Sequence, residues 1–161
     1  MRVHLYRGKP LRKEDYILNE NMQYSVGYFK DGFVYGPLIV NHDKYFICVG
    51  VASVMINSLI NNATATLIEV IPETVGEYTN LTDKNGKKIF EGDIVAYCTS
   101  TNRATNKEFH EVVFETRGES GYFGIKISNI ETWGFCMEVP AKLMGIIGNI
   151  HDNPELLDAT K

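Results

Sequence analysis

The sequence predicts a mainly β protein with two small lobes and a short helix near its C-terminus. Short runs rich in Val, Ile, Thr, Tyr and Phe alternate with turn signals along most of the chain. One of these signals, Asn85-Gly86, is the strongest short-range marker of a tight hairpin. A chain of 161 residues with 44% apolar residues can also form a substantial core in one domain or two small ones.

The first lobe, residues 1–64, is expected to be small, irregular and rich in β-structure. Turn sequences at Lys30-Asp31-Gly32 and Asn41-His42-Asp43 each lie between extended runs and predict two hairpins. The apolar residues of segment 51–60 recur at both strand and helix spacing, so its pattern fits either structure. Asn61-Asn62 is expected to form a turn. A lobe of this size is marginal alone, and we expect it to take part in oligomerisation.

The second lobe, residues 65–161, is expected to form a small curved β-barrel of the Src-homology type. About five short strands follow one another with turn signals between them, which is typical of such barrels. Glu91-Gly92-Asp93 predicts a turn in which the Asp93 side chain bonds to nearby backbone N–H groups. Asn153-Pro154-Glu155 combines an N-cap residue, a proline and an acid, and therefore predicts the start of the terminal helix.

Three blocks of the sequence, taken together in their order and spacing, are more specific than any one of them. These blocks are Ile68–Thr79, Asp83–Val95 and Gly145–Leu157. In them the sequence resembles the YopX family of phage and prophage proteins. The resemblance implies a β-rich fold, a phage or prophage origin and self-association, and it implies no catalytic residues. One departure is Asn80, which stands where the family usually has glycine.

Cysteine usage indicates a cytoplasmic protein, and the resemblance implies that this cytoplasm is that of a bacterial host. The net charge is −4, without a polybasic or acidic tail. Cys48, Cys98 and Cys136 are odd in number and widely spaced, which excludes a disulfide framework and a zinc knuckle. The N-terminus lacks an apolar signal segment, and we expect no membrane association.

The motifs of common enzymes are missing, and we expect neither catalysis nor a cofactor or metal. Glu73, Glu77, Glu91 and Asp93 lie close in sequence, but turn and surface roles explain them better than acid–base catalysis. The four histidines lack ligand spacing, and the cysteines lack a nucleophile motif. A site assembled in space stays open as a third hypothesis.

A basic turn is the one candidate binding site that the sequence offers. Lys84, Lys87 and Lys88 surround Asn85-Gly86, with Tyr78 nearby. Basic rims with aromatic platforms bind single-stranded nucleic acid on small β-barrels. The negative net charge favours the alternative, a solvated turn. Arg103 and Lys107, from a neighbouring loop, complete the candidate nucleic-acid-binding set.

The sequence therefore favours a phage or prophage accessory protein that acts by binding and by self-assembly as a homo-oligomer. A host or phage protein is a further candidate partner. The alternative is a nucleic-acid-binding accessory factor that uses the turn around Lys84–Lys88.

Overall fold

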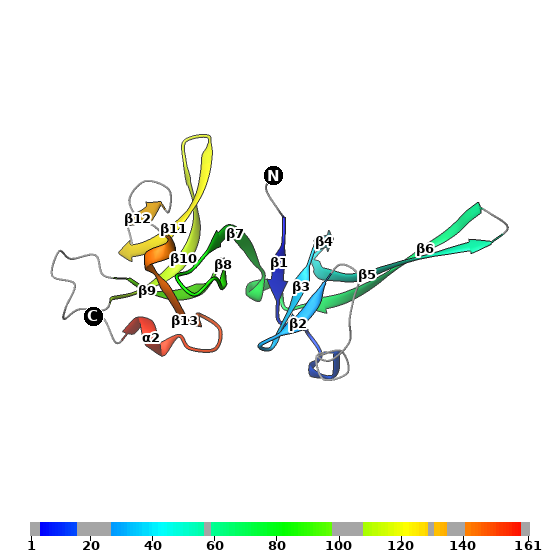
Figure 1. The fold of residues 1–161 in the computed structure, drawn as a ribbon, viewed down its shortest axis with the longest axis horizontal. Coiled ribbons are helices and arrows are strands. Elements are labelled where there is room, and N and C mark those ends of the chain that lie inside the picture. The colour runs from blue at the N-terminus through cyan, green and yellow to red at the C-terminus, as the bar shows by residue number, and fades with distance from the viewer. Residues whose placement is uncertain are drawn as a thin grey trace. The chain divides into compact units, whose positions relative to one another are not determined.

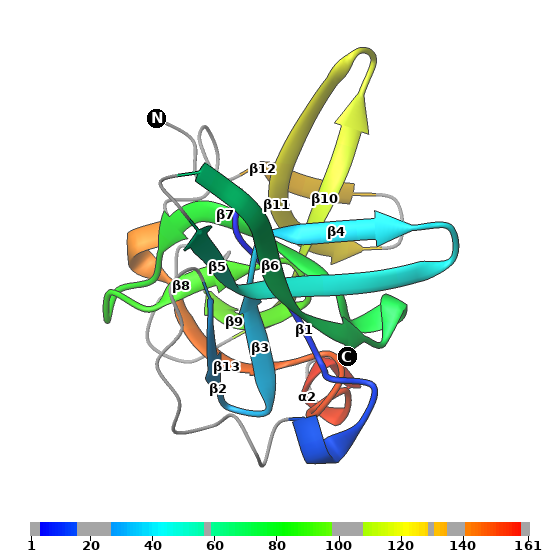
Figure 2. The same cartoon turned by 90° about the vertical axis from the view of Figure 1, so that its right-hand side faces the viewer.

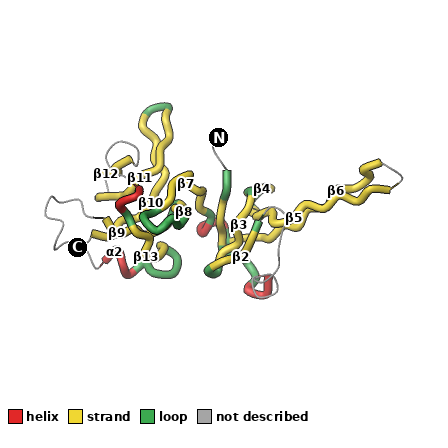
Figure 3. Tube along the Cα trace, in the orientation of Figure 1, coloured by secondary structure: helices red, strands yellow, loops and turns green. Residues whose placement is uncertain are grey.

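The computed structural model describes residues 4–15, 27–56, 59–97, 108–128, 131–134 and 141–158, without the side chains of residues 51–64, 128 and 133. Strands dominate these ranges (Figure 1, Figure 3), which confirms the predicted mainly β class. Contacts divide the chain into two compact units, Val3–Glu77 and Tyr78–Lys161. Strand β6 (Leu59–Val70) runs across residues 64 and 65, where the sequence predicted the boundary.

The first unit contains two antiparallel sheets. In one sheet the order is β2-β3-β1 and then the first residues of β7; in the other it is β4-β5-β6. The predicted turns lie between β2 and β3 and between β4 and β5, with positive φ at Asp31, Gly32 and His42. The remaining bounds in this unit are β1 Tyr6–Gly8, β2 Tyr28–Lys30, β3 Phe33–Gly36, β4 Leu38–Asn41, β5 Lys44–Ile56, the 3₁₀ helix η1 Pro72–Thr74 and β7 Gly76–Thr82.

The core of this unit forms where the two sheets meet. A Cβ atom added to Gly36 would overlap the carbonyl oxygen of Cys48, so the close approach of β3 to β5 requires glycine. Arg7 is buried with its guanidinium carbon 4.7 Å from the centroid of the Phe33 ring, a cation–π contact. The core cluster consists of Phe29, Val34, Ile47, Val49, Ile68 and Val70.

Strands β5 and β6 form a long hairpin that continues past the end of β4 (Figure 1). Their pairing runs from Tyr45↔Val70 to Ile56↔Leu59. Segment 51–60, which fitted either structure, is therefore strand on both sides of residues 57–58. The turn expected at Asn61-Asn62 is wrong, because both residues lie inside β6 and Asn62 pairs with Val54. Cross-strand pairing over this length outweighs the local turn preference of asparagine.

The second unit is built on a five-stranded antiparallel sheet of order β12-β11-β10-β9-β13. The sheet that corresponds to the predicted small curved β-barrel is not closed, because within the described ranges no ladder joins its edge strands β12 and β13. The predicted terminal helix is confirmed as α2. The bounds are β8 Lys88–Phe90, β9 Asp93–Tyr97, β10 Glu108–Arg117, β11 Ser120–Ser128, β12 Glu131–Gly134, the 3₁₀ helix η2 Ala141–Leu143, β13 Gly145–Asn149 and α2 Glu155–Asp158.

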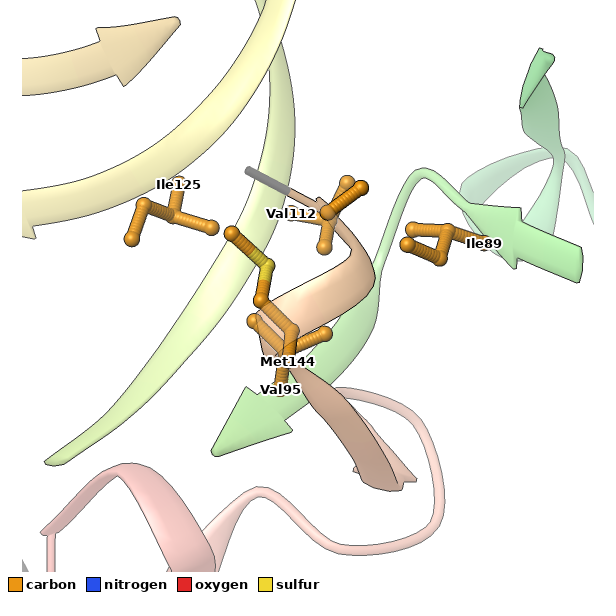
Figure 4. Close-up of a cluster of buried hydrophobic side chains, with 6 residues drawn as sticks. Ile89, Val95, Val112, Ile125 and Met144 are labelled. Carbon is orange, nitrogen blue, oxygen red and sulfur yellow. The ribbon is translucent and has the colours of Figure 1, made fainter. Parts of the chain in front are cut away.

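Side chains from several strands and from the η2–β13 connection fill the core of the second unit (Figure 4). Met144 lies among branched side chains from β8, β9, β10 and β11. The cluster is completely buried apart from a small exposed fraction of Ala141. Its members are Ile89, Val95, Val112, Ile125, Ala141 and Met144.

Candidate functional site

The basic turn lies between β7 and β8, where it presents three exposed lysines. Lys84, Lys87 and Lys88 are all exposed. Gly86 has φ +79°, a value that favours glycine, whereas Asn85 is not among the residues with positive φ. The predicted hairpin is confirmed, with one positive-φ position in the Asn-Gly pair. The turn thus displays three positive charges from a small, defined loop.

The buried carboxylate of Asp83 holds this turn in shape. Its Oδ1 accepts hydrogen bonds from the backbone N–H of Asn85 at 2.8 Å and of Lys87 at 2.9 Å. Its Oδ2 accepts the N–H of Ile146, 3.1 Å away on β13. The backbone N–H of Lys84 also donates to the carbonyl of Met144 at 3.0 Å. The turn is therefore fixed both within itself and to β13.

These donors decide the ionisation of Asp83. Burial raises its pKa, but the hydrogen bonds from Lys87, Ile146 and Asn85 outweigh burial and hold the pKa below the ordinary value of an aspartate. Asp83 is therefore a structural anion at neutral pH. Sequence reasoning missed this role, although an aspartate opening an Asn-Gly turn is a recognisable local signal.

Tyr78, the predicted aromatic member of the site, already contacts two neighbours. Its ring centroid lies 5.4 Å from that of Phe90, and the Lys88 ammonium lies 5.6 Å from the ring centroid. Burial raises the pKa of the Tyr78 hydroxyl. The ring orients Lys88 by a cation–π contact. Arg103 and Lys107, the other predicted members, lie outside the described residues.

Asn80, the departure from the resemblance, has a backbone reason. Its φ is +64°, in the left-handed region that glycine occupies freely and asparagine tolerates better than most residues. Its side-chain amide donates to the Tyr78 carbonyl at 3.4 Å. Glycine and asparagine can therefore both adopt the positive φ angle that β7 has at this position.

The carboxylates considered for catalysis have local roles where the structure describes their contacts. Asp93 Oδ2 accepts the backbone N–H of Phe90 at 2.8 Å, and Gly92 has φ +78°, which confirms the predicted turn. Glu77 lies 3.2 Å from His4 Nδ1. These contacts shape the backbone or lie at the surface.

The four histidines and Cys48 lie in separate parts of the described chain. The described residues contain no group of three or more His, Cys, Asp or Glu side chains placed to hold a metal ion. His110 is buried, with Nδ1 3.2 Å from the Lys126 carbonyl and Nε2 3.5 Å from the Glu108 carboxylate. Burial raises the pKa of neighbouring Glu111, and the Lys126 charge opposes this effect. Cys48 is buried, while Cys98 and Cys136 lie outside the described residues.

The closing block of the sequence is built around Asn149. Its Oδ1 accepts the backbone N–H groups of His151 and Asp152, each at 3.0 Å. The backbone N–H of Ile150 donates to the Gly92 carbonyl at 2.9 Å. The second and third blocks are thus joined by the β9–β13 ladder, by the bond from Ile146 to Asp83 and by the bond from Ile150 to Gly92. Their polar residues stabilise the fold of the second unit.

The chain is similar to one protein family and to a solved structure. The sequence profile of the family described as YopX protein matches residues 39–158. A similar solved structure, titled "Crystal structure of protein EF1440 from Enterococcus faecalis", shares 19% sequence identity at a TM-score of 0.45. That match covers 98% of this chain and 99% of the other. A search of curated proteins found no match.

In the ranges that the structure describes, every helix falls short of the length and apolarity that a membrane span requires.

Proposed function

The chain belongs to the YopX family, and from this premise we propose that it acts by binding and self-assembly rather than by catalysis. In this proposal it is an accessory protein of a phage or prophage, works in the cytoplasm of the bacterial host, and forms a homo-oligomer. The polar residues of its motif blocks support a non-catalytic role, because Asp83, Asp93 and Asn149 accept backbone hydrogen bonds.

The observation that carries the proposal is the presence of exposed apolar side chains on both edge strands of the β4-β5-β6 sheet. Ile39 is 40% exposed, Val40 52% and Leu67 40%. Ile39 and Val40 lie on β4, an edge strand of this sheet. Exposed apolar side chains on a sheet edge favour pairing with another chain.

Self-assembly is tested by sedimentation of the purified chain over a wide concentration range. We expect species heavier than the 18.2 kDa of one chain, increasing with concentration. A single 18.2 kDa species at the highest concentration would remove self-assembly from the proposal.

The exposed lysines of the basic turn favour a second candidate function, binding of nucleic acid. Lys84, Lys87 and Lys88 present three positive charges within one hairpin. Such a local cluster can contact phosphate groups although the net charge of the chain is negative. The contacts of Tyr78 with Lys88 and Phe90 favour phosphate binding over base stacking at this position.

Reversing the charge of Lys87 and Lys88 together tests this function. With a mixed-sequence single-stranded oligonucleotide, we expect K87E/K88E to weaken binding at least about tenfold at low salt. The slope of log affinity against log salt should fall by about two, because two phosphate contacts are lost. The matched control is K13E/K30E, which makes the same charge change at two exposed lysines of the first unit. If K87E/K88E and K13E/K30E weaken binding equally, the change in net charge explains the loss of affinity. The basic turn is then rejected as a binding site.

A further inference from the structure

The outer part of the β5–β6 hairpin, residues 51–56 and 59–64 and here termed the arm, differs in composition from the rest of the chain. Residues 45–68 contain no Asp, Glu, Lys or Arg, whereas 22% of the whole chain is charged. The segment also contains no proline. Lys44 and Glu69 are the first charges on either side, and their side chains form an ion pair of 3.1 Å at the root of the hairpin. The charge-free segment therefore includes the core residues Ile47, Val49 and Ile68 and continues from them through the arm.

Both edges of the arm lack strand partners within the described part of the chain. The outer edge of β5 is covered only near its root, by β4 and by the N–H of Gly27, which donates to Val49. The outer edge of β6 is likewise covered at its root, where Leu11 N–H donates to Glu69. Beyond Gly50 and Thr66 the ladders join β5 and β6 to each other and to no other described strand (Figure 1, Figure 2).

An isolated two-stranded ribbon is marginally stable in water. Proteins protect exposed strand edges with charges, proline, short strands or covering elements. The arm is long and has neither charge nor proline in its sequence. It therefore has the features of a strand pair that is covered by another chain.

We propose that the arm of one copy binds to β4 of a second copy by strand addition, with reciprocal exchange between the two chains. β4 is suited as the acceptor, because it is an edge strand whose Ile39 and Val40 are exposed. This inference rests on the self-assembly proposed above and names the surfaces that perform it.

A second copy fits better than an unrelated partner for two reasons. The arm carries no charge with which to select a complementary charged surface. The chain itself supplies both the arm and an apolar edge strand in the same sheet, which is what a twofold exchange requires.

The arm is long enough for strand addition to β4, which has four residues. At about 3.4 Å per residue, each strand of the arm is roughly 20 Å long, and four residues of β4 span roughly 14 Å.

Three double variants of the full chain test the exchange by sedimentation. M55K/I60K places lysines on a cross-strand pair of the arm, and I39K/V40K places them on β4. The control, L143K/I147K, alters two exposed apolar residues of the second unit. We expect each of the first two variants to weaken self-association at least about 100-fold, because lysine on an edge opposes strand addition, and the control to associate like the wild type. Far-UV circular dichroism checks that each variant retains its strands.

Mixing the two interface variants gives the decisive readout. The arm variant still has an intact β4, and the β4 variant still has an intact arm. An equimolar mixture should therefore form a mixed pair through one intact contact, although each variant alone stays near 18.2 kDa.

The possible failures are distinguishable. A monomeric wild type overturns self-assembly and the exchange together. A wild type that assembles, with interface variants that assemble equally well, overturns the exchange and leaves self-assembly standing. Two monomeric variants that do not associate in the mixture overturn β4 as the acceptor.

Discussion

Asp83→Asn is expected to lower the free energy of unfolding of the second unit by about 2–3 kcal/mol at pH 7. Both carboxylate oxygens of Asp83 accept backbone N–H groups, from Asn85 and Lys87 at Oδ1 and from Ile146 at Oδ2. An asparagine offers one acceptor oxygen and one NH₂ group in the same space. At least one backbone N–H group that now donates to Asp83 would then face the NH₂ group of the asparagine. A buried N–H group that loses a charged acceptor costs about 2–3 kcal/mol of stability.

The pH dependence of this variant separates the charge from the shape of the side chain. The folded-state pKa of Asp83 lies below its unfolded-state value, because the hydrogen bonds outweigh burial. The contribution of the ionised Asp83 side chain to the free energy of unfolding is therefore fully present above the unfolded-state pKa. It is lost as the pH falls through the folded-state pKa. The difference between wild type and Asp83→Asn should be constant from about pH 6 to 8 and shrink below about pH 4.

Urea unfolding, followed by circular dichroism at equal protein concentrations, measures the difference at each pH. Asp43→Asn is the matched control, because it removes the same charge from an exposed turn and should change stability by less than about 0.5 kcal/mol. A penalty for Asp83→Asn that persists unchanged at pH 3 would show that ionisation of Asp83 does not stabilise the fold.

The local part of this site could be predicted from the sequence, and the distant part could not. Turn chemistry is read from neighbouring residues, so the hairpin at Asn85-Gly86 and the Asp93 turn were predicted and are confirmed. The bond from Ile146 to Asp83 joins residues 63 positions apart, and no local pattern specifies it. The buried role of Asp83 depends on that distant donor.

The β5–β6 hairpin shows the same limit in the fold. Val, Met and Ile in residues 51–60 satisfy helix and strand spacing alike, so periodicity could not decide between them. Asn61-Asn62 then gave a local turn signal that cross-strand pairing overrides. The absence of charge from residues 45–68 is visible in the sequence. Our proposal of strand exchange also needs the topology, in which the outer parts of β5 and β6 pair with no other strand of the described ranges.

Met144→Ala is expected to lower the free energy of unfolding by about 2–5 kcal/mol, as truncation of a fully buried large side chain does. Met144 is 0% exposed and packs in one cluster with Ile89, Val112 and Ile125 (Figure 4). Its backbone carbonyl also accepts the N–H of Lys84. The cavity left by the truncation therefore forms directly beside the backbone that anchors the basic turn.

Leu143, the residue before Met144, supplies a matched control. The sequence alone does not show which of these two apolar residues is buried. Leu143 and Met144 are neighbouring large apolar residues, but the structure ends η2 at Leu143 and begins β13 at Gly145. Leu143 is 54% exposed, so Leu143→Ala should change stability by less than about 0.5 kcal/mol. Urea unfolding at one protein concentration compares the two variants. Equal losses of stability in the two variants would mean that Leu143 and Met144 do not lie in different environments. The burial of Met144 in the core cluster would then have to be rejected.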